Sequence, residues 1–342
     1  MKAIQLEAPK SFRRIEIPEP ASPGEGEALV RIQRVGICGT DFSIYLGKMP
    51  FVTYPRVPGH ELGVEVLAVG AGVTAVRPGD RCSVEPYMNC GQCRPCAKGN
   101  TNCCEELKVL GVMMDGGMTE RLVLPARKLH PANQLSPEQC ALVETLAIGC
   151  HAVNRGKAVR GETVLIIGTG PIGSSVGEFT RLAGARTIFM DLSEPRLKFV
   201  REKMWINDTI LSKGDGKELE ALQEMTGGEL PTLVIDATGS NQSMSSALKY
   251  CAFTGRLVFV GLTQAEIAFP HAPIMHRREL TILASRNALP EDFKRIIKLI
   301  EEGRIDTRPW ISHRAGFEEM IGAFPDWMKP ETGVIKAMVE VG

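Results

Sequence analysis

Short runs in which apolar and polar residues alternate dominate the chain from its start to about residue 150. The clearest are EALVRIQRVGI (27–37) and LGVEVLAVGAGV (62–73), and turn signals such as RPGD (77–80) separate them. Alternation with a period of two places every second side chain on one face of a strand. The pattern therefore predicts a largely β domain with irregular loops.

From Thr163 the pattern changes to apolar runs separated by segments long enough for a helix. The runs are TVLIIGTG (163–170), RTIFMD (186–191), TLVIDATG (232–239), RLVFVGL (256–262) and LTILAS (280–285). Strands that alternate with helices form βαβ units. We therefore predict an α/β domain built on a doubly wound parallel sheet.

The end of the chain resembles its beginning more than its middle. A helical segment, PEDFKRIIKLIEEG, leads to a strand-like tail that ends VIKAMVEV. We therefore predict one domain made of residues 1–152 and 288–342, which encloses a second domain of residues 153–287.

Composition narrows the class of protein. The chain has 342 residues, enough for about two domains, and its 40 basic and 40 acidic residues balance. A neutral chain argues against nucleic acid or an acidic membrane as the partner. The N-terminal segment has no apolar signal-peptide core, and no apolar run approaches the ~18 residues of a membrane span. We expect a cytoplasmic protein.

Four cysteines spaced C-x2-C-x2-C-x7-C, namely Cys90, Cys93, Cys96 and Cys104, lie in a loop rich in glycine and proline. Short spacers let one loop supply four thiolates to a tetrahedral zinc ion. The alternative is a disulfide pair or chance clustering, but spacing and composition agree on zinc. We predict a closed, structural zinc lobe at about residues 88–106.

A glycine-rich motif follows the first strand of the α/β region. Gly168, Gly170 and Gly173 form G-x-G-x-x-G between a strand and a helix, and Asp191 closes the next strand. Such glycines let the backbone approach a pyrophosphate at a helix N-terminus, while the acid accepts hydrogen bonds from the ribose. A carboxylate there repels a 2′-phosphate, so NAD is favoured over NADP; Arg196 softens that preference. The alternative is an ordinary glycine turn.

Three further segments carry candidate metal ligands: Cys38 in VGICGTD, His60 and Glu61 in VPGHELGVEV, and Glu144 in LVETLAIGCHA. Alone, each is an ordinary packed or solvated residue. In order, GICGTD, GHE, the four-cysteine lobe, GTGPIG and DATG resemble the zinc-dependent medium-chain alcohol dehydrogenase family. The resemblance covers essentially the whole chain and points to the polyol and sugar-acid branch, which includes sorbitol, galactonate and threonine dehydrogenases.

The resemblance implies a GroES-like catalytic domain, a Rossmann cofactor domain and two zinc ions per chain. The catalytic zinc would be held by Cys38, His60 and a carboxylate. Either Glu144 or Glu61 suits that third position, and we favour Glu144 with Glu61 close by. In the cofactor domain, the resemblance adds Pro171, Ile172 and Thr238 to the residues that bind NAD.

The resemblance also implies a reaction in which zinc acts as a Lewis acid and hydride passes from a secondary alcohol to NAD⁺, giving a keto product. Thr40 would pass on the substrate proton, and Asp41 would orient the zinc-bound histidine. Many relatives have a histidine in the proton relay where this chain has Ser43, which puts the relay in doubt but not the reaction.

The substrate is predicted from ASRNALPEDF, which resembles sugar-acid and polyol dehydrogenases. Arg286 and Asn287 follow the last predicted strand, and Arg286 either binds a substrate carboxylate or orders neighbouring groups. The alternatives are an L-threonine 3-dehydrogenase-type enzyme, another alcohol dehydrogenase, or a zinc-containing binding protein without catalysis, whose sign would be a lost catalytic ligand. We expect a homodimer or homotetramer that acts on a small-molecule alcohol.

Overall fold

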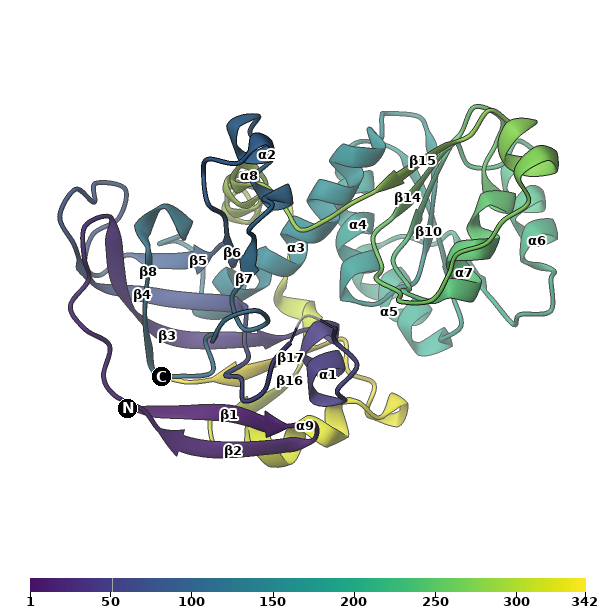
Figure 1. Ribbon diagram of the computed structural model, residues 1–342. Helices are drawn as coiled ribbons and strands as arrows, with labels where there is room; N and C mark the ends of the chain where they lie inside the picture. Colours follow the sequence, from purple (N-terminus) through teal and green to yellow (C-terminus); the bar gives the residue numbers. More distant parts are fainter. Residues whose placement is uncertain (51) are drawn as a thin grey trace. The chain divides into compact units, whose positions relative to one another are not determined.

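A computed structural model describes residues 1–50 and 52–342 of the chain (Figure 1). The chain divides into two compact units, Met1–Ala147 with Ala288–Gly342, and Ile148–Asn287. The boundary between Ala147 and Ile148 falls within helix α3 (Pro137–Gly156), as does the boundary at residue 152 that the sequence suggested. None of the helices in the described residues is long and apolar enough to cross a membrane.

A seven-stranded sheet forms the centre of the first unit. Its order is β16 (Ile311–Gly316), β17 (Lys336–Glu340), β3 (Glu27–Ile37), β4 (Glu61–Val69), β5 (Arg81–Val84) and β9 (Leu129–Pro131), with β8 (Arg121–Pro125) also paired to β3. Alternation in β3 buries Ala28, Val30 and Ile32, as the sequence pattern requires of a strand with one face in a core. The predicted strand at 27–37 is confirmed.

Strand β17 brings the end of the chain back into this sheet. It pairs antiparallel with β3, where Ala337 lies opposite Ile37. Two smaller sheets are β1 (Lys2–Ala8) with β2 (Ser11–Glu16) and β6 (Tyr87–Met88) with β7 (Lys108–Val109). The helices are α1 (Gly39–Tyr45), α2 (Arg94–Ala97), α8 (Pro290–Glu301), α9 (Met320–Trp327), and the short η1 (Thr101–Cys103), η2 (Ala126–Lys128), η5 (Arg308–Trp310) and η6 (Pro330–Thr332).

The second unit is a six-stranded parallel sheet with helices on its two sides (Figure 1). The order is β12 (Thr209–Leu211), β11 (Arg186–Asp191), β10 (Thr163–Ile167), β13 (Leu233–Asp236), β14 (Arg256–Phe259) and β15 (Thr281–Ala284). The helices are α4 (Pro171–Leu182), α5 (Glu194–Met204), α6 (Glu218–Thr226), α7 (Asn241–Ser246), the short η3 (Ala247–Tyr250) and the π-helical η4 (His271–His276). All five predicted strands are present, and the predicted fold class is confirmed.

The strand order of this sheet reverses between β10 and β13. The loops after these strands lie close together, because a Cβ placed on Gly168 would be 3.0 Å from Cγ2 of Thr238. In open α/β sheets, ligands bind outside the carboxyl ends of the strands at such a reversal. The fold therefore places the glycine motif and Thr238 where a cofactor site is expected.

Candidate metal and cofactor sites

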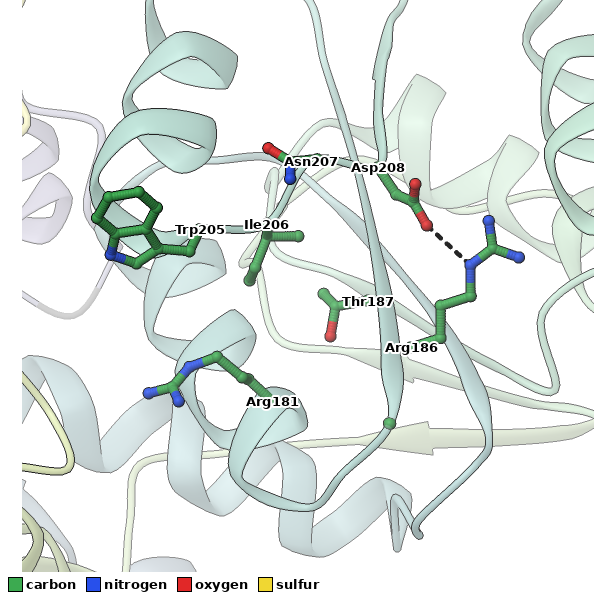
Figure 2. A pocket seen from close by; sticks show the side chains of 8 residues that line it. Arg181, Arg186, Thr187, Trp205, Ile206, Asn207 and Asp208 are labelled. Carbon is green, nitrogen blue, oxygen red and sulfur yellow. Dashed lines mark hydrogen bonds and ion pairs between the residues drawn. The ribbon is translucent and has the colours of Figure 1, made fainter.

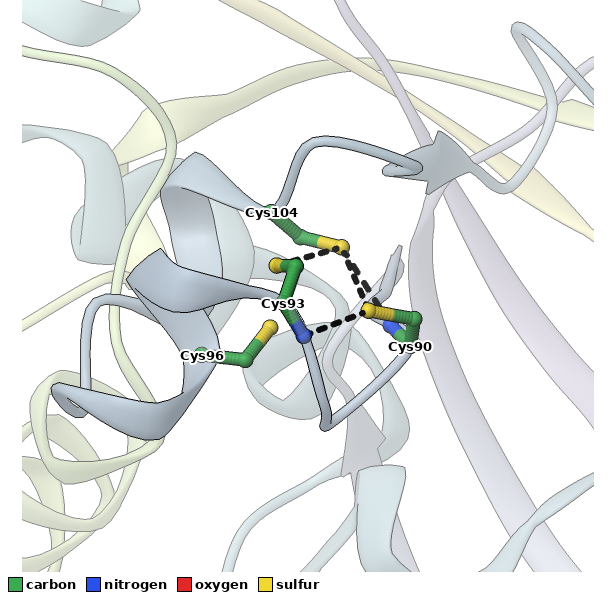
Figure 3. A group of neighbouring side chains, drawn as sticks. All are labelled: Cys90, Cys93, Cys96 and Cys104. Carbon is green, nitrogen blue, oxygen red and sulfur yellow. Dashed lines mark hydrogen bonds between the residues drawn. The ribbon is translucent and has the colours of Figure 1, made fainter.

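The four cysteines of the lobe, Cys90, Cys93, Cys96 and Cys104, point toward one another (Figure 3). Their Sγ atoms lie within 4.8 Å of one another, and all four are free thiols. The Sγ atoms of Cys93 and Cys104 are 3.8 Å apart, and those of Cys104 and Cys90 are 3.5 Å apart. Four thiolates at about 2.3 Å from zinc lie about 3.8 Å from one another. The group therefore fits a closed tetrahedral site.

Local backbone geometry builds this lobe. Cys93 precedes α2, Cys96 lies within it, and Cys104 follows η1. The backbone N–H groups of Cys93 and Cys90 donate to the sulfurs of Cys90 and Cys104, at 3.4 and 3.3 Å. Hydrogen bonds from backbone N–H groups, first that of Glu105, lower the pKa of Cys93 to about 7. N–H donors favour the thiolate form, which is the form that binds metal.

A second group of potential metal ligands consists of Cys38, His60 and Glu61, whose ligand atoms also lie within 4.8 Å of one another. Cys38 follows β3 and is the N-cap of α1, while Glu61 is the first residue of the neighbouring strand β4 and His60 directly precedes it. Pairing of β3 with β4 therefore brings together residues more than twenty positions apart in the chain. His60 and Glu61 are buried.

Asp41 supports this group from helix α1. Its Oδ2 accepts a hydrogen bond from the backbone N–H of Cys38 at 2.9 Å, and its Oδ1 lies 3.7 Å from Nδ1 of His60. Oδ1 of Asp41 and Nδ1 of His60 are buried, and neither has a hydrogen-bond partner among the described residues. A carboxylate in this place orients a metal-binding histidine through its second ring nitrogen. At 3.7 Å the two atoms do not form a hydrogen bond, so the orienting role expected for Asp41 remains a prediction.

The charges around His60 suit a divalent cation. Burial alone would lower the pKa of His60, but the negative charges of Asp41, Cys38 and Glu144 raise it well above its ordinary value. Burial also raises the pKa of Asp41 and Glu144. Buried anionic metal ligands are stable only when a nearby cation compensates their charge. The donor set of one thiol, one imidazole and carboxylates is one that zinc accepts.

Glu61 is held by a lysine that the sequence analysis did not single out. Nζ of Lys336 donates to both carboxylate oxygens of Glu61, at 2.5 and 2.7 Å, and to the carbonyl oxygen of Ile37 at 3.2 Å. The two side chains are 1% and 0% exposed. Gly36 makes room for this pair, because a Cβ there would lie 2.1 Å from Oε2 of Glu61. The sequence signal that could have identified Lys336 is its position as a lone lysine in the apolar run VIKAMVEV.

Glu144 lies on α3 and is held by a tyrosine that the sequence analysis also missed. The hydroxyl of Tyr87 donates to Oε1 of Glu144 at 2.5 Å, and both side chains are buried. Among the described residues, the group with mutual distances within 4.8 Å contains Glu61 but not Glu144. Glu144 is nevertheless close enough for its charge to raise the pKa of His60. The choice between the two carboxylates remains a prediction.

The two candidate relay hydroxyls lie on α1. Thr40 is half-buried, two residues after Cys38. Ser43 donates its hydroxyl to the backbone carbonyl oxygen of Gly39 at 3.1 Å. Ser43 thus bonds back to a carbonyl of its own helix, and the proton-passing role of Thr40 remains a prediction.

The predicted phosphate cradle lies between β10 and α4. Gly168 has a φ of +95°, and a Cβ on Gly173 would lie 1.8 Å from the carbonyl oxygen of Gly168. These two positions require glycine for a tight turn and for close packing of the helix. Gly170 precedes the helix, Pro171 is its first residue and Ile172 its second. The free N–H groups at this N-terminus can bind a pyrophosphate.

Asp191 ends β11 beside this cradle. Its Oδ2 accepts hydrogen bonds from the backbone N–H and the hydroxyl of Thr169, both at 2.6 Å, and its Oδ1 accepts from the N–H of Ser193 at 2.8 Å. Arg196 is also adjacent, since a Cβ on Gly170 would lie 3.9 Å from its Nη1. The fold therefore brings together the residues proposed to discriminate NAD from NADP.

We expect Asp191→Ala to lower the ratio of kcat/KM for NAD to that for NADP by at least about tenfold, because the substitution removes both the ribose acceptor and the charge that repels a 2′-phosphate. The control is Asp208→Ala, which removes the carboxylate that pairs with Arg186 at the opposite end of β11. Initial rates with both cofactors measure the ratio. An unchanged ratio in Asp191→Ala would show that this carboxylate does not contact the ribose.

A hollow of about 320 Å³ lies at that opposite end of β11 (Figure 2). Arg181, Arg186, Trp205, Asn207 and Asp208 are among the residues that line it. Arg186 is the first residue of its strand, so the hollow is at the amino ends of the parallel strands. Ligands of such sheets bind at the carboxyl ends, and none of the predicted site residues lines this hollow.

The proposed substrate residues follow β15, at the carboxyl edge of the same sheet. Arg286 is exposed. Asn287 adopts a φ of +52°, and its buried side-chain nitrogen has no hydrogen-bond partner among the described residues. Thr238, at the same edge, donates its N–H and hydroxyl to Asp236 at 2.9 and 2.7 Å, which fixes the loop after β13.

Comparison with known proteins gives concordant results. Residues 24–134 match the alcohol dehydrogenase GroES-like domain, and residues 171–302 match the zinc-binding dehydrogenase family. The chain is 38% identical to L-galactonate-5-dehydrogenase of Escherichia coli K12 over 93% of its own length and 92% of the relative. It is 31% identical to L-arabinitol 4-dehydrogenase of Hypocrea jecorina, over 92% and 85%. The crystal structure of the alcohol dehydrogenase RspB from E. coli CFT073 with NADH superposes with a TM-score of 0.92 at 29% identity, covering 100% and 99%.

Proposed function

The chain belongs to the zinc-dependent medium-chain alcohol dehydrogenase family, and from that membership we propose that it oxidises a secondary alcohol of a sugar acid, with NAD⁺ as the hydride acceptor. The observation that carries the proposal is the 38% identity to L-galactonate-5-dehydrogenase over 93% of the chain. A neutral polyol is the second candidate, because a relative at 31% identity is an arabinitol dehydrogenase.

Catalysis is favoured over a binding role because no candidate donor has been lost. Cys38, His60 and Glu61 lie together in one group of the first unit, and Glu144 is close enough for its charge to act on His60. When bound there, zinc would supply Lewis acidity to the alcohol, and NAD⁺ would accept the hydride. Asp41 faces the imidazole of His60 at 3.7 Å and would orient it as a metal ligand, and the hydroxyl of Thr40 would accept the substrate proton while it passes its own proton on.

We propose Glu144 rather than Glu61 as the third metal ligand. Both oxygens of Glu61 accept hydrogen bonds from Lys336, so binding a metal would break part of a buried ion pair. Tyr87 occupies only Oε1 of Glu144 and leaves Oε2 available. The distances favour Glu61, but the hydrogen bonds favour Glu144, and a side-chain rotation costs less than an unpaired buried lysine.

A substrate panel tests the proposed function. NADH absorbance should report the highest kcat/KM for L-galactonate, a lower value for the matching polyol galactitol, and the lowest for L-threonine and ethanol. Turnover of L-threonine above both sugar derivatives would establish the amino-alcohol alternative. Activity on ethanol alone would overturn the sugar-acid and polyol proposal.

Arg286 provides a sharper test of the carboxylate. If its guanidinium binds the carboxylate of the substrate, Arg286→Leu should raise KM for L-galactonate at least about tenfold and leave KM for galactitol nearly unchanged. The control is Arg304→Leu, at a position that flanks a helix of the first unit. This substitution should change neither KM. Equal increases for both substrates would contradict carboxylate binding and leave Arg286 with a structural role.

A further inference from the structure

The phenol of Tyr87 forms a hydrogen bond with one oxygen of the Glu144 carboxylate, and within the described residues the second oxygen has no hydrogen-bond partner. The phenol hydroxyl donates to Oε1 of Glu144 at 2.5 Å, across 57 residues of sequence. An ionised carboxylate only accepts, so the direction of this bond is set by chemistry. Because the bond occupies one oxygen, it also limits rotation of the carboxyl group about its terminal bond.

The ring of Tyr87 is itself immobilised. It is 2% exposed and packs edge-to-face on Phe293 of α8, with ring centroids 6.3 Å apart. Phe293 also stacks on His130 at 4.9 Å. His130 contacts Glu85 at 3.3 Å, and Glu85 forms a buried ion pair with Lys128. A ring in such a layer cannot change rotamer without opening a cavity.

The backbone of Tyr87 is fixed by the four-cysteine lobe. Tyr87 pairs with Val109 in the two-stranded sheet of β6 and β7, which closes the lobe at its base. Asn89, two residues later, donates to Sγ of Cys96 at 3.6 Å and accepts from Arg127 at 2.8 Å. Both the main chain and the side chain of Tyr87 are therefore held before any metal binds to Glu144.

We propose that Tyr87 is a positioning residue that holds Glu144 in the orientation required to bind the catalytic metal. The inference rests on the proposed role of Glu144 as the third ligand. Hydrogen-bond partners of metal ligands are worth about 10- to 100-fold in metal affinity. Tyr87 therefore contributes to the metal centre through Glu144 and without touching the metal.

The test is the metal affinity of Tyr87→Phe, which keeps the ring and removes only the hydroxyl. Zinc-loaded protein is titrated with a chelator, and the zinc that remains bound is measured at each concentration. We expect the less tightly held zinc to leave at a chelator concentration about 10- to 100-fold lower than in the unmodified protein, while the four-cysteine zinc is retained. Tyr250→Phe, at a buried tyrosine of the second unit, is the matched control and should change neither zinc.

A double variant separates failure of this inference from failure of the ligand assignment. Glu144→Gln should weaken binding of the same zinc, and adding Tyr87→Phe should weaken it no further, because Tyr87 acts through Glu144. If Glu144→Gln lowers the affinity but Tyr87→Phe does not, the positioning role is wrong. If Glu144→Gln leaves the affinity unchanged and Glu61→Gln lowers it, the ligand assignment is wrong and the proposal for Tyr87 falls with it.

Discussion

Cys38→Ala should lower kcat/KM by at least about a thousandfold and leave the protein folded. Cys38 belongs to the second group of potential metal ligands, together with His60 and Glu61. A metal held by this group would stabilise the charge that develops on the substrate. Such stabilisation is worth several kcal/mol, and each 1.36 kcal/mol is a factor of about ten in rate. Zinc content should fall from about two to about one per chain, and NADH binding measured by calorimetry should not change.

Cys93→Ser should have the opposite profile. A closed four-thiolate site contributes directly to folding, so thermal unfolding should shift to lower temperature in step with the loss of one zinc. Cys82→Ala, at a buried cysteine of the same unit outside both groups, is the control for loss of a thiol. If Cys93→Ser lost turnover at full thermal stability, the four-cysteine site would not be structural. If Cys38→Ala retained turnover, the catalytic site would lie elsewhere.

Lys336→Met should destabilise the protein by about 3–5 kcal/mol, because it leaves the carboxylate of Glu61 buried without its partner. The side chains are 1% and 0% exposed, so water cannot replace the missing charge. Urea unfolding at neutral pH, followed by circular dichroism, measures the change. Lys329→Met is the control: its partner Asp326 is 2.5 Å away, but both side chains are more than half exposed, and such pairs contribute little.

The double variant Lys336→Met with Glu61→Gln distinguishes loss of charge pairing from loss of packing. Without the carboxylate charge, most of the lost stability should return, since the remaining side chains are neutral and similar in size. A double variant as unstable as Lys336→Met would show that Lys336 stabilises the sheet through its packing. If Lys336→Met were as stable as the unmodified protein, the ion pair between Lys336 and Glu61 would not contribute to stability.

The parts of the site that spacing alone predicts are those whose partners are local, whereas the group of Cys38, His60 and Glu61 was predicted from the family resemblance. The four cysteines lie within one loop, and Gly168 to Gly173 lie in one turn, so spacing alone determines which atoms meet. Strand β3 was predicted at its observed bounds because its residues alternate between buried and more exposed as far as Ile32 and end in a buried run. Strand β12 was missed because its three residues give no periodic pattern.

The parts that could not be predicted depend on contacts between distant residues. Lys336 and Glu61 are 275 positions apart, and Tyr87 and Glu144 are 57 apart. Neither pair has a spacing rule, because only the pairing of β17 with β3 and the position of α3 bring them together. The choice between Glu61 and Glu144 as the ligand depends on these same partners, which is why the sequence left it open.

The return of the chain to its first sheet also determines the order in which the protein can fold as it is synthesised. Residues 148–287 form a continuous unit, which can fold while the ribosome is still adding the rest. The first unit must wait for β17: at ~5–20 residues per second, Lys336 emerges roughly 14 to 55 seconds after Glu61. Until then, Glu61 lacks its cation, and residues 34–37 of β3 lack β17, the strand that pairs with them on the edge opposite β4. We therefore expect the nascent chain to be most prone to aggregation, and most dependent on chaperones, in this interval.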